Sequence, residues 1–390
     1  IEHDKYRWGS RDVLYHQGIT ENRWPIKDFI NWLDSDKPQT KLKHILQQQG
    51  ADLSDYSMNT QNIVYYPTNK IRIPVNRKNV LESGLVKMKD TANIVDYIDI
   101  DLPTSAITKK SMMMLDILAN NDWKRPIYFS GGSFDDAEYI WMKDYLQLDG
   151  MAYKLVPIKT ERRNSFEMGR IDSDLMYDIV MKWDWGNSGS PDIYHDPQTR
   201  IQSISYRSNL ARLVETLINE DKIEKAKDII NLAMDNMPLD YFGYYTFVEP
   251  FVDGYYKVGE TTKARALFEK LKVKYQERLT YYEGFTLDAQ YENIDEIISD
   301  MEAYRRNIDI LINNNDREMA EKETLIFNEY IDKFNHFYKD EEPEMDLSPT
   351  GNPDLIDTVG ISDTIANDAT SVENTEAQEE IKDTILVPQN

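Results

Sequence analysis

The second half of the chain repeats one spacing of residues. Ala226, Ile230, Ala233 and Pro238 lie at offsets 0, +4, +7 and +12, and Ala264, Phe268 and Leu271 repeat the first three offsets 38 residues later. Offsets of 4 and 7 place side chains on one helix face, and proline ends a helix. Small residues on such a face let two helices approach closely. The pattern therefore predicts paired helices throughout residues 205–340.

This spacing is similar to that of tetratricopeptide repeats, in which two-helix units of about 34 residues stack side by side. An apolar helix face precedes the first copy at Leu210, Leu213, Val214 and Leu217. Residues 300–337 are helical in pattern but lack the spacing. Two copies leave two interpretations open, a tetratricopeptide-like domain or a generic antiparallel helical bundle.

The first 160 residues have a different pattern, in which helical runs and short alternating runs take turns. Residues 97–102 alternate Ile98, Ile100 and Leu102 with aspartates, which predicts a half-buried strand. The same reasoning predicts strands at residues 70–75, 127–129 and 152–158, and helices at residues 26–33, 42–49, 108–121 and 135–148. This order predicts an α/β domain at residues 1–160, with a sheet covered by helices. A connector follows at residues 161–204, with one short helix at residues 173–182.

The net charge of −24 is unevenly distributed along the chain. Residues 341–390 hold 13 acidic residues and one lysine, which is half of that charge, and they include no aromatic residue. Such a segment buries too little apolar surface to offset its ordering entropy, so the sequence predicts a disordered acidic tail. The tail is either a solubilising tether or a ligand for a basic partner.

Composition excludes several classes of function. The chain has no cysteine, which excludes disulfides, cysteine nucleophiles and Cys-type zinc sites, and its five histidines argue against a His-rich metal site. The acidic balance argues against a nucleic-acid partner. The P-loop lysine and the dinucleotide fingerprint are absent, and we expect no cofactor.

The chain begins at Ile1 without a leader, and no apolar run in it approaches the roughly 18 residues of a membrane span. This predicts a soluble piece, processed or cut from a longer protein.

Two polar clusters have the chemistry to bind ions. Residues 131–133, Gly-Gly-Ser, separate a predicted strand from a predicted helix, where backbone N–H groups can cradle an anion, although Asp135 follows. Asp99 and Asp101 share one strand face near Asp96 and offer the oxygen ligands of a hard cation. We expect an ordinary turn and a solvated strand face, with ion binding as the alternative in both places.

His195 lies between Asp192 and Asp196 in a loop rich in glycine and proline. An imidazole next to carboxylates can act as a general acid or base, but the same residue types are common in turns. Near the N-terminus, residues 11–24 are rich in arginine, tyrosine and tryptophan. This composition is typical of a membrane interface, and an ordinary surface patch is the alternative.

Two longer runs carry a resemblance to a known family. They are WKRPIYF at residues 123–129 and YLQLDGMAYKLVPI at residues 145–158. Together with residues 18–32, 112–121 and 176–212, they resemble the soluble C-terminal region of multi-spanning membrane proteins of Bacteroidota. Those proteins are related to protein O-mannosyltransferases, which are glycosyltransferases of the GT-C type. The resemblance extends over residues 10–290.

The resemblance implies a periplasmic domain tethered to the inner membrane by preceding transmembrane helices. It also implies two kinds of partner, the membrane-embedded part of the same protein and protein or glycan acceptors. The catalytic acid and the donor site of such enzymes belong to the membrane part, so no catalytic, cofactor or metal residue is carried over. We expect a domain that is not catalytic by itself, and the alternative is a stand-alone scaffold protein of the cell envelope.

Three triplets of the tail resemble the Asp-Thr/Ser-aliphatic acceptor of O-glycosylation in Bacteroidota. They are centred on Thr358, Thr364 and Thr384, each preceded by aspartate and followed by valine or isoleucine. An acceptor threonine must be accessible in an extended segment. The resemblance implies that these threonines carry glycans, although a composition rich in these residue types produces such triplets by itself.

Overall fold

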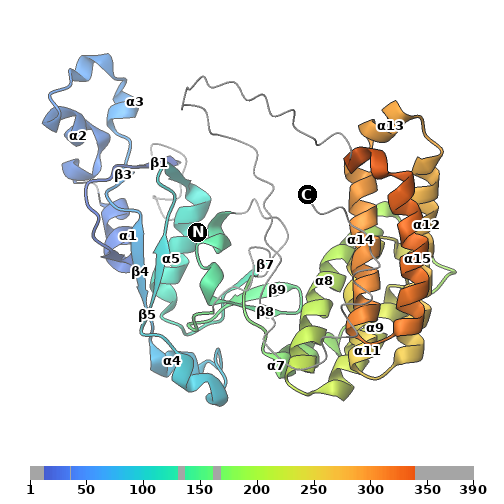
Figure 1. Cartoon of the computed structure of the whole chain (residues 1–390). Helices are drawn as coiled ribbons and strands as arrows, with labels where there is room; N and C mark the ends of the chain where they lie inside the picture. Colours follow the sequence, from blue (N-terminus) through green and yellow to red (C-terminus); the bar gives the residue numbers. More distant parts are fainter. Residues whose placement is uncertain (1–12, 36, 131–136, 161–167, 339–390) are drawn as a thin grey trace, which may run out of the picture. The chain divides into compact units, whose positions relative to one another are not determined.

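The computed structural model describes residues 13–35, 37–130, 137–160 and 168–338 (Figure 1). The chain divides into two compact units. The first unit contains residues up to Gly186 together with Ser205–Asp221, and the second contains Asn187–Ile204 together with residues from Lys222 onward. Helix α8 (Pro197–Asn219) therefore contributes residues to both units.

Within the described ranges, the first unit has three sheets of three short strands. Strand β1 pairs parallel to β3 and antiparallel to β6, β4 pairs parallel to β2 and antiparallel to β5, and β9 pairs antiparallel to both β7 and β8. The strands are β1 Val13–His16, β2 Trp24–Pro25, β3 Tyr65–Tyr66, β4 Lys70–Pro74, β5 Tyr97–Asp101, β6 Ala106–Thr108, β7 Tyr128–Ser130, β8 Leu146–Asp149 and β9 Ala152–Leu155.

Helices and short 3-10 turns connect and cover these strands. The α-helices are α1 Ile26–Asp34, α2 Leu42–Gln48, α3 Met58–Gln61, α4 Arg77–Glu82, α5 Lys109–Asn121, α6 Ala137–Ile140, α7 Ser173–Val180 and the part of α8 from Ser205 onward. Ile26, Phe29, Ile30 and Leu33 form the buried face of α1, at the spacing that the sequence predicts. The predicted α/β class of this part is confirmed, with its strands distributed over small sheets.

Alternating isoleucines form the pair of strands β4 and β5, as the sequence predicts. The strands run antiparallel, with Ile71 opposite Ile100 and Ile73 opposite Ile98. These four side chains are at most 3% exposed and belong to the core of the unit. The residues between them point to the opposite face, because successive side chains of a strand alternate.

One predicted helix is wrong over most of its length. The sequence predicts a helix at residues 135–148, but the described part of this stretch is helical only in α6 and in a 3-10 turn at Lys143–Tyr145. Leu146–Asp149 forms β8, which pairs with β9. This pairing satisfies the backbone and buries Leu146 and Leu148 completely, so tertiary contacts override the local pattern.

From Lys222 onward, the described residues of the second unit form helices joined by short turns, as the sequence predicts, whereas its residues 187–196 form a loop. Its helices are α9 Ile223–Asn236, α10 Leu239–Phe242, α11 Glu249–Lys257, α12 Thr261–Glu283, α13 Leu287–Glu292, α14 Ile294–Asn313 and α15 Arg317–Lys333. Helices α12, α14 and α15 pack side by side (Figure 1). None of the helices in the described ranges of the chain combines the length and the apolarity that a bilayer crossing needs.

The residues of the repeated spacing lie at helix contacts. Ala226, Ala233 and Ala264 are fully buried, and so are the large residues Ile230 and Phe268 of the same faces. Helix α11 packs against both α9 and α12. The small residues therefore lie in the buried core between helices, which is the role that their spacing predicts.

The core of the second unit also contains carboxylates, each bound by one tyrosine and one cation. In the described residues four such sets bridge the helices, and α12 contributes to every one. They are Glu249 with Tyr275 and Arg306, Asp300 with Tyr245 and Arg278, Asp316 with Tyr256 and Arg265, and Glu323 with Tyr304 and Lys272. A buried charge is tolerated only when it is paired and hydrogen-bonded, so these sets require the helices to keep their positions.

Candidate functional site

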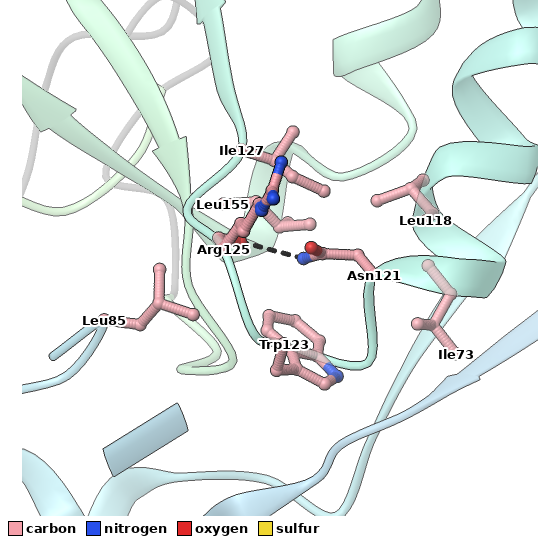
Figure 2. A pocket seen from close by; sticks show the side chains of 8 residues that line it. All are labelled: Ile73, Leu85, Leu118, Asn121, Trp123, Arg125, Ile127 and Leu155. Carbon is pink, nitrogen blue, oxygen red and sulfur yellow. Dashed lines mark hydrogen bonds between the residues drawn. The ribbon is translucent and has the colours of Figure 1, made fainter. Parts of the chain in front are cut away.

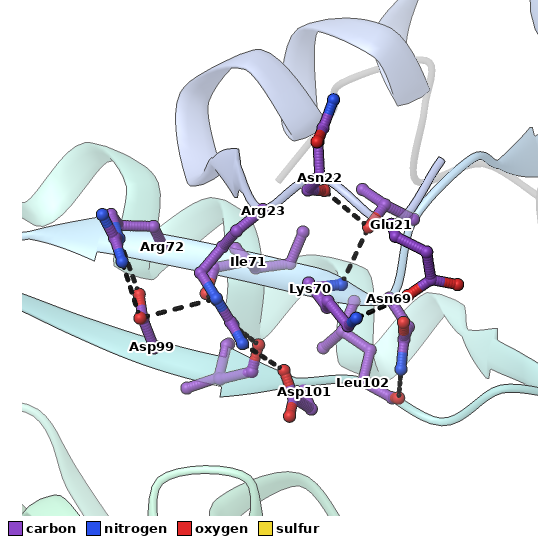
Figure 3. A network of polar contacts seen from close by, with 12 residues as sticks. Glu21, Asn22, Arg23, Asn69, Lys70, Ile71, Arg72, Asp99, Asp101 and Leu102 are labelled. Carbon is purple, nitrogen blue, oxygen red and sulfur yellow. Dashed lines mark hydrogen bonds and ion pairs between the residues drawn. The ribbon is translucent and has the colours of Figure 1, made fainter. Parts of the chain in front are cut away.

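The aspartates on the outer face of β5 are paired with arginines (Figure 3). Arg72 binds Asp99 through two hydrogen bonds, Nε to Oδ1 at 2.7 Å and Nη2 to Oδ2 at 2.8 Å. Arg23 lies 3.4 Å from Asp99 Oδ2 and donates to Asp101 Oδ1 at 2.8 Å. The hydrogen bonds from Arg72, helped by the charge of Arg23, hold the pKa of Asp99 below its ordinary value.

Arg23 also fastens the two strands to each other. Its Nη1 donates to the backbone oxygens of Ile71 in β4 and Ile100 in β5, at 3.1 and 2.8 Å. The face is thus an arginine–carboxylate network, and its acids are occupied by guanidinium groups. Among the residues that the structure describes, no three potential ligands gather around a metal position.

His195 has a structural environment in the second unit. Its Nε2 lies 2.7 Å from the backbone oxygen of Ser188. Its ring stacks on Tyr241 at 5.9 Å between centroids and meets Phe242 edge-on at 4.8 Å. Asp196 accepts hydrogen bonds from the backbone of Gln198 and from Thr199 at the start of α8. No described carboxylate is hydrogen-bonded to the imidazole, so the acid–base pair that the loop sequence suggests is not formed.

Several other predicted positions lie outside the described residues. These are the Gly-Gly-Ser loop at residues 131–133 and the tail threonines Thr358, Thr364 and Thr384. The N-terminal aromatic and basic stretch is described from residue 13 onward. In it Trp24 packs edge-on against Trp32, and Arg23 belongs to the network on β4 and β5.

The run at residues 123–129 forms a packed corner of the first unit (Figure 2). Trp123 is 5% exposed, and its Nε1 donates to the backbone oxygen of Pro74 at 2.8 Å. Asn121 donates from Nδ2 to the backbone oxygen of Arg125 at 2.8 Å, which closes the turn. The cavity beside these residues measures about 10 Å³, room for roughly one water molecule. Trp123 is therefore a packing residue, and the cavity beside it is too small for a ligand, while Lys124, Arg125, Pro126 and Tyr128 are exposed.

The run at residues 145–158 forms the hairpin of β8 and β9, with a buried polar cluster that sequence reasoning missed. Lys154 Nζ lies 2.9 Å from Asp149 Oδ2, and Gln147 Nε2 donates to Asp149 Oδ1 at 2.8 Å. All three residues are at most 7% exposed. The signal was present, since Gln147 and Asp149 are two positions apart and so share a strand face, and Gln147 is directly opposite Lys154.

The turn of this hairpin requires glycine. Gly150 has φ +71°, and a Cβ atom there would lie 2.8 Å from the ring of Trp183. Asn209 of α8 donates to the backbone oxygen of Gly150 at 3.1 Å. The run at residues 145–158 thus has a structural role: Trp183 packs against its tight turn at Gly150, and Asn209 donates a hydrogen bond to that turn.

A cavity with room for a ligand group lies in the second unit, among α9, α10, α11 and α12. Its volume is about 200 Å³. The lining consists of Met234, Pro238, Leu239, Tyr255, Ala266 and Leu267, with Lys263 and Lys270 beside them. Leu239 and Tyr255 are buried, whereas both lysines are exposed. We call this site the α9–α12 groove. Sequence reasoning had singled out Pro238 only as the end of a repeat.

Polar contacts fix the groove at one end. The Tyr255 hydroxyl donates to Asn231 Oδ1 at 3.1 Å, and Lys263 Nζ donates to the same oxygen at 2.8 Å. Burial raises the pKa of Tyr255 to about 12, so its hydroxyl stays neutral at physiological pH. Lys270 pairs with Asp240 at 2.8 Å. The groove therefore combines an apolar floor with two accessible cations, which suits an apolar group next to a negative charge.

Residues 1–175 match the family model of TMEM260-associated domain 2. This family is linked to O-mannosyltransferase-like proteins. The match agrees with the relation to O-mannosyltransferases that residues 123–129 and 145–158 suggest, and it ends before α8 and the helices of the second unit. No curated protein and no solved structure matches the chain.

Proposed function

We propose that the chain is an accessory part of a GT-C-like membrane glycosyltransferase, located in the periplasm, which binds protein or glycan acceptors and is not catalytic by itself. The observation that carries this proposal is the match of residues 1–175 to a TMEM260-associated domain. The α9–α12 groove supports the acceptor-binding role, because its volume and lining suit one apolar side chain of a bound segment. Membrane tethering through a preceding transmembrane region is part of the same proposal.

The test is the transfer of sugar by the parent protein in its host. We expect that deletion of the whole of this chain from the parent protein reduces sugar transfer to acceptor proteins, and that the isolated chain transfers no sugar. Measurement of glycosylated acceptors by intact mass, with equal amounts of parent protein in the membrane fraction as the control, checks this. Normal transfer after the deletion would contradict the proposal.

The tail threonines are proposed to be acceptors themselves. We predict added hexose mass on chain purified from the host, located at Thr358, Thr364 and Thr384 by peptide fragmentation. Replacing the three by alanine is expected to remove the added mass, whereas the same replacement at Thr350 and Thr370, which no aspartate precedes, leaves it unchanged. An unmodified intact mass in the native host would overturn this assignment.

A stand-alone scaffold of the cell envelope is the second candidate. It is favoured by the boundary of the family match, since the helical unit with its groove lies outside residues 1–175. Fractionation of host cells decides between the two. Native protein of this chain's mass alone in the periplasmic fraction supports the scaffold, and detection only within a larger membrane-bound species supports the glycosyltransferase.

A further inference from the structure

The α9–α12 groove has the size of one apolar side chain. Its volume of about 200 Å³ is slightly larger than the roughly 150 Å³ of an apolar cavity that accepts a benzene molecule. Met234, Leu239 and Leu267 supply apolar lining from three different helices. A single isoleucine, leucine or aromatic residue is therefore the natural occupant, and an extended segment that carries it would lie along α12.

The cations beside the cavity are available to a negatively charged ligand. Lys263 and Lys270 are seven positions apart on α12, which places them on one face about 10 Å apart along the helix axis. Lys263 is bound by the neutral amide of Asn231. Lys270 pairs with Asp240, and the two side chains are 54% and 51% exposed, so the pair exchanges readily with other anions.

The tail of this chain has the complementary chemistry. Residues 341–390 contain 13 acidic residues and one lysine. Near the end, Asp383, Ile385 and Leu386 place a carboxylate two residues before an aliphatic pair. Residues 339–382 separate this segment from the last described residue, and a chain of that length spans roughly 140 Å when extended. The longest helix that lies wholly in the second unit, α12, has 23 residues, or roughly 35 Å, so the segment reaches any surface of the unit.

We propose that residues 383–387 of this chain dock in the α9–α12 groove. Ile385 fills the cavity, and Asp383 replaces Asp240 as the partner of Lys270. A tethered segment has a local concentration in the millimolar range, which makes a weak contact effective. The proposal uses the groove to which the proposed function assigns acceptor binding, but it does not rest on that function, because it concerns a contact within one chain and its test measures no sugar transfer.

The absence of cysteine allows a direct test on the full chain. Asn390→Cys gives one labelling position for a nitroxide, and methionines carrying ¹³C-methyl groups report its proximity through signal broadening. We expect the Met234 signal in the groove to be lost. The signals of Met58 and Met88, which are 67% and 78% exposed, are expected to remain, because they report only random encounters.

Matched variants separate the two parts of the contact. Lys263→Glu with Lys270→Glu is expected to restore the Met234 signal, whereas Lys78→Glu with Lys322→Glu changes the charge equally elsewhere and leaves it broadened. Ile385→Ser restores the signal without touching the folded part. Asp240→Asn, which frees Lys270, is expected to strengthen the broadening.

Three outcomes would overturn the proposal. One is a Met234 signal that is broadened no more than those of Met58 and Met88. Another is equal broadening in both lysine double variants. The third is equal broadening when nitroxide-labelled chain without ¹³C is mixed with ¹³C-labelled chain without nitroxide, since that would place the tail of one copy on the groove of another.

Discussion

Glu323 illustrates what a single buried charge requires of its neighbours. It is fully buried on α15 and accepts hydrogen bonds from Lys272 at 2.7 Å and from Tyr304 at 2.9 Å. The Tyr304 hydroxyl in turn accepts a hydrogen bond from Gln276 at 2.7 Å. Hydrogen bonds thus join Lys272, Glu323, Tyr304 and Gln276 in sequence, so removal of a buried member leaves its neighbours desolvated and incompletely bonded.

We predict that Glu323→Ala lowers the free energy of unfolding by about 2–3 kcal/mol, because it removes the buried acceptor of Lys272 and Tyr304 and leaves Lys272 with only the partly exposed Glu269 as a carboxylate partner. Urea unfolding of the full chain, followed by circular dichroism, measures the loss. Asp240→Ala is the matched control, since it breaks the exposed pair with Lys270 and should cost at most about 1 kcal/mol. Equal effects of the two substitutions would contradict the role assigned to burial.

At the scale of elements, α12 connects the helices of the second unit through its cations and one tyrosine. Two carboxylates bound by α12, Asp316 and Asp300, have pKa values shifted in opposite directions. Burial alone would raise the pKa of Asp316, but the hydrogen bonds from Arg265 and Tyr256 hold it below its ordinary value of 3.8. For Asp300 burial outweighs the hydrogen bond from Arg278, and its pKa is raised. The two carboxylates therefore link folding to pH with opposite signs.

We predict different acid responses for Asp316→Asn and Asp300→Asn. A lowered pKa in the folded state stabilises it above the unfolded pKa of about 3.8, and this contribution disappears as the pH falls through the folded-state pKa. Asp316→Asn should therefore lose less stability between about pH 5 and pH 2 than the parent chain. Asp300 takes up its proton more tightly when folded, so Asp300→Asn should lose more stability on acidification. Urea titrations across this range test both, and identical pH slopes in all three proteins would refute the assignment.

The elements that the sequence predicts well are those whose own periodicity decides the structure. Residues 26–33 and the strand pair of β4 and β5 follow their patterns, since each has one face in the core. Strand β8 depends on its pairing with β9, and β2 and β3 have only two residues, too few for any period. The local hydrophobic pattern therefore does not predict β2, β3 or β8.

The sites were harder to predict than the elements. The sequence identifies Asp99 as a candidate cation ligand and His195 as a candidate acid or base. Their partners in the structure, Arg72 and Tyr241, are distant in sequence and could not be foreseen. The α9–α12 groove combines side chains of four helices, so no single stretch of sequence describes it. The role of each of these residues therefore depends on its contacts in the folded chain, which its residue type and local sequence do not specify.

At the scale of the whole molecule, the first unit extends beyond the family match and takes in part of α8. Arg212 donates from Nη2 to the backbone oxygens of Met168 and Gly169, at 3.0 and 2.9 Å. Asn209 holds the turn at Gly150, and Ser173 donates to Glu220. These contacts join residues 205–221 to the sheet of β7, β8 and β9 and to the start of α7.

We predict that a fragment of residues 1–221 is more stable than one of residues 1–186, which lacks these contacts. Near-ultraviolet circular dichroism and urea unfolding of both fragments measure the difference. Arg212→Ala in the full chain should destabilise the first unit in the same direction, with the exposed Lys78→Ala as its control. A fragment of residues 1–186 with the same unfolding midpoint as residues 1–221 would contradict this prediction.

The division of α8 between the two units has a consequence for synthesis on the ribosome. Residues 187–204 of the second unit are made before residues 205–221 complete the first. The N-terminal unit therefore cannot finish folding until part of the next unit has already emerged, although domains usually fold as separate units in order of synthesis. During that interval the turn of the β8–β9 hairpin lacks the hydrogen bond that Asn209 donates to Gly150.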